Sequence, residues 1–279
     1  MYIVGFDAKG TMHKPVALRP EQTLADATNI MIRYNISRVI IERRGRPVGI
    51  ITEKDIARFL YEQTPARRID EIRLEEIMST GLITVNPDSD LRYGAKLMQK
   101  NQVSSLVVVD AKNNLKGIFT KTDLVNAYIE YFSLRHKVRA FMTKKVFTVA
   151  PDEPIHAAIM LMMGNRISRV VVTKNGSPVG IVSGKDLLPL GAYFSTQGGI
   201  GLKRKVQAFI PSGVKARMLV SDIMTPEPIV TEPDSDLADA AYVMIRNRIS
   251  GLPVVGPRGA LVGIVTKSDI VTALAHSSA

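Results

Sequence analysis

The chain repeats one seven-residue pattern four times, and this repetition limits what its 279 residues can fold into. Each copy has a Gly, two apolar residues, a Thr or Ser, and an Asp three residues after that hydroxyl. A Pro stands 35 or 36 residues before each of the four Asp residues. Self-similarity at a fixed spacing predicts four copies of one supersecondary unit that pack against each other. The copies are GIITEKD from Gly49, GIFTKTD from Gly117, GIVSGKD from Gly180 and GIVTKSD from Gly263.

Each unit has the same expected order of elements. After the Pro, apolar and small residues lie on one helix face, as Leu24, Ala27, Thr28 and Met31 do in the first unit. Two short stretches rich in β-branched residues follow and predict a hairpin. The second stretch ends at the motif Thr or Ser, where another apolar helix begins. We therefore expect every unit to run strand, helix, strand, strand, helix.

A lead-in segment precedes each unit. In three units it carries a Met six residues before Thr84, Thr148 or Val230. In the first unit Met12 stands only five residues before Ala17. We therefore expect the first lead-in to differ from the others.

The composition excludes several kinds of functional site. The chain has no Cys, which rules out disulfides, thiolate metal sites and cysteine nucleophiles. The four His residues, at positions 13, 136, 156 and 276, lack the spacing of metal ligands, so we expect no metal. The length favours two domains with a large core. No apolar run approaches the ~20 residues of a membrane span, and the N-terminus lacks a leader pattern, so we expect a cytoplasmic protein without membrane contact.

The net charge of +11 is concentrated in two connecting segments. Neither the segment between Glu130 and Asp152 nor that between Asp186 and Asp222 contains an acidic residue. These segments are either solvated linkers or patches that attract phosphate, nucleic acid or an acidic partner, and the sequence leaves both possibilities open. Their basic residues are Arg135, Lys137, Arg139, Lys144 and Lys145 in the first, and Lys203, Arg204, Lys205, Lys215 and Arg217 in the second.

The motif itself has two interpretations. A Thr-x-x-Asp can cap a helix, with the hydroxyl and the carboxylate satisfying backbone amides of the first turn. Such a box ordinarily has Glu or Gln at the return position, yet all four copies here have Asp. A helix N-terminus also attracts phosphate, and a nearby carboxylate can accept hydrogen bonds from ribose hydroxyls. The repeated Asp therefore favours the nucleoside-binding interpretation over the cap.

The repeated unit resembles the cystathionine β-synthase (CBS) domain in four copies. Pairs of CBS domains form Bateman modules, and a chain with four is similar to the nucleotide-binding gamma subunit of AMP-activated protein kinase and its stand-alone archaeal relatives. The resemblance implies an α/β fold of four tandem βαββα repeats, whose two Bateman modules pack as a pseudo-symmetric disk. We expect repeats at 1–66, 67–136, 137–196 and 197–279, and modules at 1–136 and 137–279.

The resemblance also implies ligands and site residues. CBS modules bind adenosyl compounds such as AMP, ADP, ATP and S-adenosylmethionine. The motif hydroxyl would hold phosphate and the Asp would hold ribose, in the pairs Thr52 with Asp55, Thr120 with Asp123, Ser183 with Asp186, and Thr266 with Asp269. The backbone at Ala17, Thr84, Thr148 and Val230 would contact the adenine edge, and Ile36, Val103, Ile167 and Ile249 would cover the ring.

The repeats differ at the residue after the Ser that precedes the hairpin. It is Arg38 in the first and Arg169 in the third, but Ser105 and Gly251 in the others. The resemblance implies that the two Arg side chains hold phosphate from across the module, and the guanidinium fork suits that task. Where the family often has a second basic residue, this chain has Ser37 and Ser168.

We interpret the chain as a regulatory adenine-nucleotide sensor and not an enzyme, because the repeats leave no room for a catalytic domain. An S-adenosylmethionine sensor and a nucleic-acid-associated regulator that uses the basic connectors are the alternatives. We expect an unidentified regulated protein as a partner, and a homodimer is compatible with this. The segment 195–217 contains GGIGLK, which lacks the Gly-Lys-Ser/Thr ending of a phosphate loop, so we expect a Gly-rich loop there.

Overall fold

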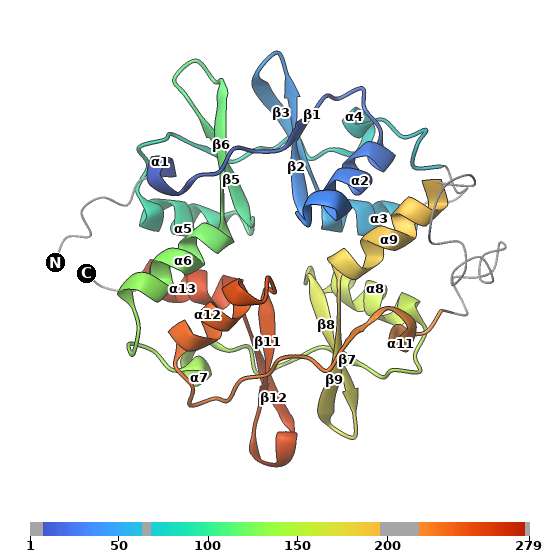
Figure 1. Ribbon diagram of the computed structural model, residues 1–279, viewed down its shortest axis with the longest axis vertical. Helices are drawn as coiled ribbons and strands as arrows, with labels where there is room; N and C mark the ends of the chain where they lie inside the picture. The colour runs from blue at the N-terminus through green and yellow to red at the C-terminus, as the bar shows by residue number, and fades with distance from the viewer. Residues whose placement is uncertain (1–7, 63–67, 196–217, 277–279) are drawn as a thin grey trace.

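The computed structural model describes residues 8–62, 68–195 and 218–276, which form a disk of four similar α/β repeats (Figure 1). Repeat 1 comprises α1 (Ala8–Thr11), β1 (Ala17–Leu18), α2 (Leu24–Tyr34), β2 (Arg38–Arg43), β3 (Arg46–Thr52) and α3 (Glu53–Glu62). Repeat 2 comprises α4 (Leu74–Ile77), β4 (Thr84–Val85), α5 (Leu91–Lys100), β5 (Ser105–Val109), β6 (Leu115–Thr120) and α6 (Lys121–Tyr131).

The other two repeats have the same order of elements. Repeat 3 comprises α7 (Val138–Phe141), β7 (Thr148–Val149), α8 (Ile155–Gly164), β8 (Arg169–Lys174), β9 (Ser177–Ser183) and α9 (Gly184–Ser195). Repeat 4 comprises α11 (Val220–Ile223), β10 (Thr225–Pro226), α12 (Leu237–Arg246), β11 (Gly251–Val255), η2 (Pro257–Gly259), β12 (Leu261–Thr266) and α13 (Lys267–His276). The predicted α/β order of the repeat is confirmed. Residues 196–217, which include nearly all of the predicted Gly-rich loop, lie outside the described residues.

The sheets are built from hairpins with a short parallel strand on one edge. The pairs β2 with β3, β5 with β6, β8 with β9 and β11 with β12 are antiparallel. The first strand of repeats 1, 2 and 3 pairs parallel with the first hairpin strand. Repeat 4 has a single parallel bridge instead, from Thr231 to Val254. Gly45 and Gly176 have φ of 78° and 79° in two hairpin turns, a conformation that glycine adopts without strain.

Lead-ins cross from one repeat to its neighbour and hold the repeats together in pairs. His13 pairs with Ile118 of β6, and Ser79 pairs with Ile50 of β3, so repeats 1 and 2 exchange their lead-ins. Thr143 pairs with Ile264 of β12, and β10 pairs with β9, so repeats 3 and 4 do the same. These exchanges define two modules, one of repeats 1 and 2 and one of repeats 3 and 4.

The first Gly of each motif makes room for the lead-in Met of the module partner. A Cβ at these four glycines would lie 2.5–2.9 Å from the Met Sδ, which is closer than real Cβ contacts come. The pairs are Gly49 with Met78, Gly117 with Met12, Gly180 with Met224, and Gly263 with Met142. Met12 and His13 take the same places as their counterparts, and the first lead-in differs in the loop that follows, which is one residue shorter.

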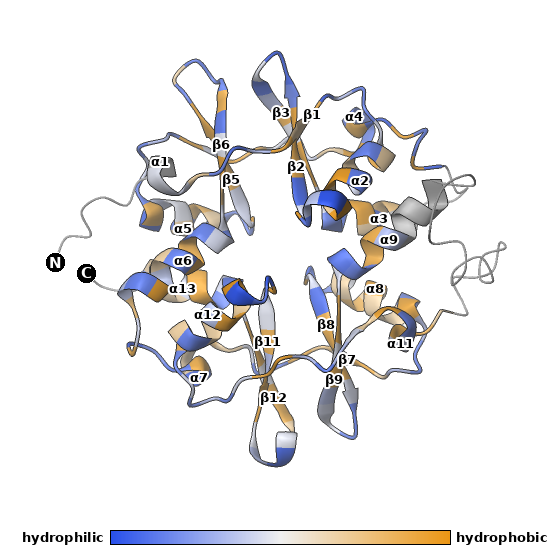
Figure 2. Cartoon of the chain, viewed as in Figure 1, coloured by the Kyte–Doolittle hydropathy of each residue, from blue (hydrophilic) through white to orange (hydrophobic). Residues whose placement is uncertain are grey.

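The two modules meet through the helices that follow the motifs. Helix α6 packs against α12 and α13, and α3 packs against α9, so the repeats follow one another around the disk in the order 1, 2, 4, 3 (Figure 1). One hydrophobic core is continuous between repeats 2 and 4, and Leu188 of α9 joins the core of repeat 1. The outer ends of the hairpins are largely hydrophilic, as are the inner ends of β2 and β8 (Figure 2). The four motifs lie where the hairpins end and the following helices begin, toward the middle of the disk (Figure 1).

Candidate functional site

Each motif Asp caps its helix with one carboxylate oxygen. In repeat 1 the backbone N–H of Thr52 donates to Asp55 Oδ2 at 2.8 Å and the Thr52 hydroxyl donates to the same oxygen at 2.6 Å. The other three motifs have the same two hydrogen bonds, at 2.6–2.8 Å. The motif hydroxyl also accepts from a backbone N–H of the first turn in repeats 2 and 4. The carboxylate half of the predicted cap is therefore present in every copy. It uses only Oδ2, and leaves Oδ1 for another partner.

The second oxygen, Oδ1, has a different partner in each of the first three repeats. Arg58 donates to Asp55 Oδ1 at 3.1 Å, and His13 Nε2 lies 2.7 Å from Asp123 Oδ1. The Thr225 hydroxyl lies 3.4 Å from Asp186 Oδ1. Within the described residues no hydrogen bond reaches Oδ1 of Asp269. The four predicted ribose positions are thus not equivalent, and that of Asp269 is the least occupied.

The environment of Asp269 is also electrostatically distinct. Burial raises the pKa of its carboxyl, while hydrogen bonds from Thr266 and the charges of Lys121 and Arg169 oppose that rise. A half-buried carboxylate with a free oxygen and cations nearby is suited to accept hydroxyl donors from a ligand.

Both repeats of a module contribute to each predicted site. The residue after the lead-in Met of one repeat lies beside the motif of the other, as the contacts of His13 with Asp123 and of Thr225 with Asp186 show. From there the chain runs back to its own sheet. The residues predicted to contact adenine lie on this path: Ala17 in β1, Thr84 in β4, Thr148 in β7, and Val230 just before the bridge of Thr231.

One of these positions lies on a cleft between repeats 3 and 4. Thr148 shares the cleft, of about 260 Å³, with residues of the β8–β9 hairpin and with Leu261 of β12. The other lining residues are Lys144, Val146, Thr173 and Gly176.

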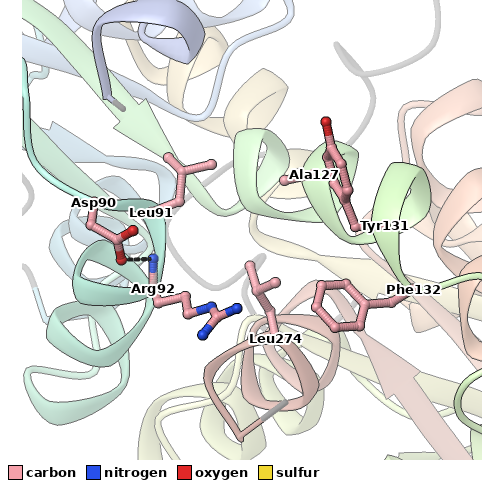
Figure 3. A pocket seen from close by; sticks show the side chains of 7 residues that line it. All are labelled: Asp90, Leu91, Arg92, Ala127, Tyr131, Phe132 and Leu274. Carbon is pink, nitrogen blue, oxygen red and sulfur yellow. Dashed lines mark hydrogen bonds between the residues drawn. The ribbon is translucent and has the colours of Figure 1, made fainter. Parts of the chain in front are cut away.

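A second hollow, between α5, α6 and α13, is shown in Figure 3 and has a volume of about 20 Å³. It has room for about one water molecule and is too small for a nucleotide.

The apolar residues predicted to cover the ring are half-buried. They are Ile36, Val103, Ile167 and Ile249, and each lies at the margin of a core. The backbone N–H of each donates at 3.0 Å to the carbonyl of the Met five residues earlier, which is Met31, Met98, Met162 or Met244. Each therefore packs on a core with one part of its side chain and keeps another part accessible.

The two predicted phosphate-binding Arg side chains reach across their modules. Arg38 donates to the carbonyl of Ser104 at 2.8 Å and to the Ser37 hydroxyl at 3.0 Å. Arg169 donates to the carbonyl and the hydroxyl of Ser250, both at 2.6 Å. Burial lowers the pKa of both guanidinium groups, and nearby carboxylates, Glu53 foremost, oppose this.

Gly251 explains why repeat 4 has no Arg of its own at this position. A Cβ there would lie 2.6 Å from Arg169 Nη1, so a larger residue would displace the guanidinium. Ser105, the equivalent residue of repeat 2, follows the carbonyl that accepts from Arg38. The asymmetry between repeats therefore places one Arg in each module. Each donates only part of its five N–H groups to the protein.

Four Lys residues that are not among the predicted site residues join these Arg side chains. Each lies between the hydroxyl and the Asp of a motif, and the pattern is visible in TEKD, TKTD, SGKD and TKSD. Lys121 donates to Ser268 at 2.7 Å and Lys267 donates to Thr122 at 3.0 Å, so each crosses between modules. Lys185 donates to Asn35 at 3.1 Å. We call Arg38, Lys54, Lys121, Arg169, Lys185 and Lys267 the central cations.

The central cations act on one another across all four repeats. Burial lowers the pKa of Lys121 to about 8, and the charges of Lys54, Arg38 and Arg169 contribute. Burial likewise lowers the pKa of Lys267 to about 8, with contributions from Lys185, Arg169 and Arg38. Like charges held together in partly desolvated surroundings attract an anion strongly.

The basic connectors lie apart from this centre. Arg135, Lys137, Lys144 and Lys145 are exposed, and Arg139 forms an ion pair with Asp234 at 2.6 Å. The second connector, with Lys203, Arg204, Lys205, Lys215 and Arg217, lies outside the described residues. Across residues 8–62, 68–195 and 218–276, no group of three His, Asp or Glu side chains could hold a metal ion. No helix in this part of the chain is long and apolar enough to cross a membrane.

Comparisons with known proteins agree with this architecture. Uncharacterized protein MJ1225 of Methanocaldococcus jannaschii is 23% identical over 92% of this chain and 94% of its own length. Its crystal structure matches with a TM-score of 0.84 at 22% identity, and the match covers 96% of this chain and 99% of MJ1225. CBS domain-containing protein YhcV of Bacillus subtilis is 34% identical over 42% of this chain and 81% of YhcV.

A protein of known structure from Pyrococcus horikoshii matches over 96% of this chain and all of its own, with a TM-score of 0.66 at 23% identity. The family model for the CBS domain matches residues 7–62, 74–130, 138–191 and 220–276, one segment in each structural repeat. Because these segments make up most of the chain, it belongs to the CBS domain family, with four CBS domains paired into two Bateman modules.

Proposed function

We propose that the chain is a regulatory protein that senses cellular energy by binding adenine nucleotides, AMP, ADP or ATP, and that it acts by binding and not by catalysis. The observation that carries this proposal is the convergence of six central cations from all four repeats where the motif helices begin. Helix N-termini and cations together favour bound phosphate. The description of MJ1225 relates that protein to the γ subunit of AMP-activated protein kinase, which agrees with the proposal.

Three groups of residues would each bind one part of the nucleotide. Its phosphates would lie at the central cations and the motif hydroxyls. Its ribose would donate to a motif Asp through Oδ1, the oxygen that capping does not use. Its adenine would lie against the half-buried apolar residues and the backbone near Ala17, Thr84, Thr148 or Val230.

The first site to be occupied would be the one at Asp269. Its Oδ1 accepts no hydrogen bond within the described residues, whereas Oδ1 of Asp55 accepts from Arg58 and that of Asp123 lies 2.7 Å from His13. A ribose hydroxyl would have to displace those partners. Thr148, on the cleft between repeats 3 and 4, belongs to the lead-in that faces Asp269.

The central cations favour nucleotides over S-adenosylmethionine. That ligand has a positively charged sulfonium where a nucleotide has its phosphate, so the central cations would repel it. The proposal includes a protein partner whose behaviour changes with nucleotide occupancy, and it is compatible with a homodimer.

Isothermal titration calorimetry with adenosine, AMP, ADP, ATP and S-adenosylmethionine tests the proposal. We expect the phosphorylated ligands to bind at least tenfold more tightly than adenosine, and S-adenosylmethionine to bind more weakly than AMP. Binding of S-adenosylmethionine with no binding of any nucleotide would contradict the proposal.

A further inference from the structure

Glu53 is an acidic residue placed among the central cations. It directly follows the motif hydroxyl of repeat 1, where the other repeats have Lys121, Gly184 and Lys267. Three of the four motifs thus place a cation or no side chain at this position. The proposed nucleotide site gives Glu53 no role, since a carboxylate repels phosphate.

The side chain of Glu53 crosses from repeat 1 to repeat 3. A Cβ on Gly184 would lie 2.9 Å from Glu53 Cγ, so the absence of a side chain at Gly184 makes room for it. Its Oε2 is buried and has no hydrogen-bond partner among the described residues. An unpartnered buried carboxylate oxygen destabilises a fold unless nearby charges compensate for it.

Cations supply that compensation. Arg38, Lys185, Arg169 and Lys54 all favour the ionised form of Glu53, against burial, which raises its pKa. In return, Glu53 is the foremost charge that supports the ionised forms of Arg38 and Arg169. Within the described residues the Glu53 carboxylate is thus held by charges and not by hydrogen bonds, as an anion drawn to these cations would be.

The two sides of the centre therefore differ in charge. On the side of repeats 1 and 3, Glu53 offsets part of the positive charge of Lys185 and of Arg38 and Arg169, although these two guanidinium groups also reach Ser104 and Ser250 of repeats 2 and 4. On the side of repeats 2 and 4, Lys121 and Lys267 face each other's motifs, and the acids that act on them, Asp269 and Asp123, are already engaged as helix caps.

We propose that Glu53 is an internal counter-anion that sets how many phosphate charges the centre accepts. It leaves enough positive charge for a monophosphate and repels the additional charges of a triphosphate. The parent chain therefore discriminates against ATP relative to AMP more than a chain without this carboxylate would. The expectation for AMP and ATP rests on the proposed function. The expectation for inorganic tripolyphosphate does not, because that ligand has no adenine.

The test compares the parent with Glu53→Gln in calorimetric titrations of adenosine, AMP, ATP and inorganic tripolyphosphate. Glu53→Gln removes the charge with little change in shape. Loss of one nearby like charge is expected to strengthen ATP and tripolyphosphate binding by roughly tenfold, AMP binding by less, and adenosine binding by less than about twofold. If Glu53 had a purely structural role, the substitution would change the affinities for all four ligands equally or would change none of them.

Two further variants support the comparison. Glu75→Gln removes an acid on α4 that forms ion pairs with Arg43 and Arg73, and should leave the ligand ratios at the parent values. Glu53→Ala also removes the charge and places no amide among the cations. It replaces Glu53→Gln if the latter fails to fold.

The outcomes separate this inference from the proposed function. If the parent binds no adenine nucleotide but the Glu53 variants gain tripolyphosphate affinity, the proposed function fails and the inference holds. If AMP binds and the ratio of ATP to AMP affinity is the same in the parent and both Glu53 variants, the inference is overturned and the proposed function stands. If neither variant gains affinity for tripolyphosphate, the inference is likewise overturned.

Discussion

Lys121 of repeat 2 donates a hydrogen bond of 2.7 Å to Ser268 of repeat 4, so a cation of one module is held by the motif helix of the other. Lys267 of repeat 4 in turn donates a hydrogen bond of 3.0 Å to Thr122 of repeat 2. The two modules thus share their charged centre. An anion bound at one motif acts on residues of both modules, which is the physical requirement for coupling between sites.

The first prediction concerns the Arg side chains. Replacing Arg38 and Arg169 by Ala should weaken AMP binding by about 1.5–3 kcal/mol for each lost charged hydrogen-bonding group, while adenosine binding changes little. Calorimetry with both ligands measures this. Equal losses for adenosine and AMP would show that the Arg side chains only hold the repeats in place, through Ser104 and Ser250.

The second prediction concerns pH and the two Lys residues with a pKa of about 8. Phosphate favours their protonated form, so AMP affinity should fall as pH rises from 7 to 9. The double variant Lys121→Gln with Lys267→Gln should bind more weakly at pH 7 and lose most of this pH dependence. An unchanged pH profile in the double variant would contradict the assignment.

The same Lys residues predict an opposite trend for the stability of the ligand-free protein. Their folded pKa of about 8 lies below the ordinary 10.5, so between these values the unfolded chain binds more protons than the folded chain. The free energy of unfolding should therefore rise from pH 8 to 10.5 by an amount that the double variant lacks. Urea denaturation of both proteins at several pH values measures the difference.

A fourth prediction concerns Gly251. Its replacement by Ala should displace Arg169, since the Cβ would lie 2.6 Å from Nη1, and should weaken AMP binding several-fold. Gly164→Ala at the end of α8 is the matched control, because nothing lies within 4 Å of its Cβ. The control should melt at or slightly above the parent temperature. Equal AMP affinities in the two variants would contradict the role given to Gly251.

Much of the fold could be predicted from the sequence because the repeat fixes it locally. The helix periodicity after each Pro and the β-branched hairpins are properties of short segments, and the structure confirms both. The exchange of lead-ins could not be predicted, since it depends on which repeat lies beside which. The sequence nonetheless contains both residues of each contact, the motif Gly and the lead-in Met, which the structure brings together in four pairs.

The site was predicted less completely than the fold. The sequence offers capping and ribose binding as alternative roles of the motif Asp, whereas the structure assigns capping to Oδ2 and leaves Oδ1 to other donors. The central Lys residues were missed because they shift by one position between motifs, as in TEKD and TKTD. An alignment that compares the four motifs position by position does not show them. In space they converge, because the first turn of a helix presents both positions to the same region.

The most direct test of the central claim is thermal melting of the parent and of Asp55→Asn, Asp123→Asn, Asp186→Asn and Asp269→Asn, each with and without AMP or ATP. A ligand that binds only the folded protein at a hundredfold excess over Kd adds about 2.7 kcal/mol, which should raise the parent Tm by several degrees. We predict that Asp269→Asn melts near the parent without ligand and loses the largest share of this rise. If no adenine nucleotide raises the parent Tm, or if all four variants keep the full rise, the repeated Asp serves only as a helix cap and the account is contradicted.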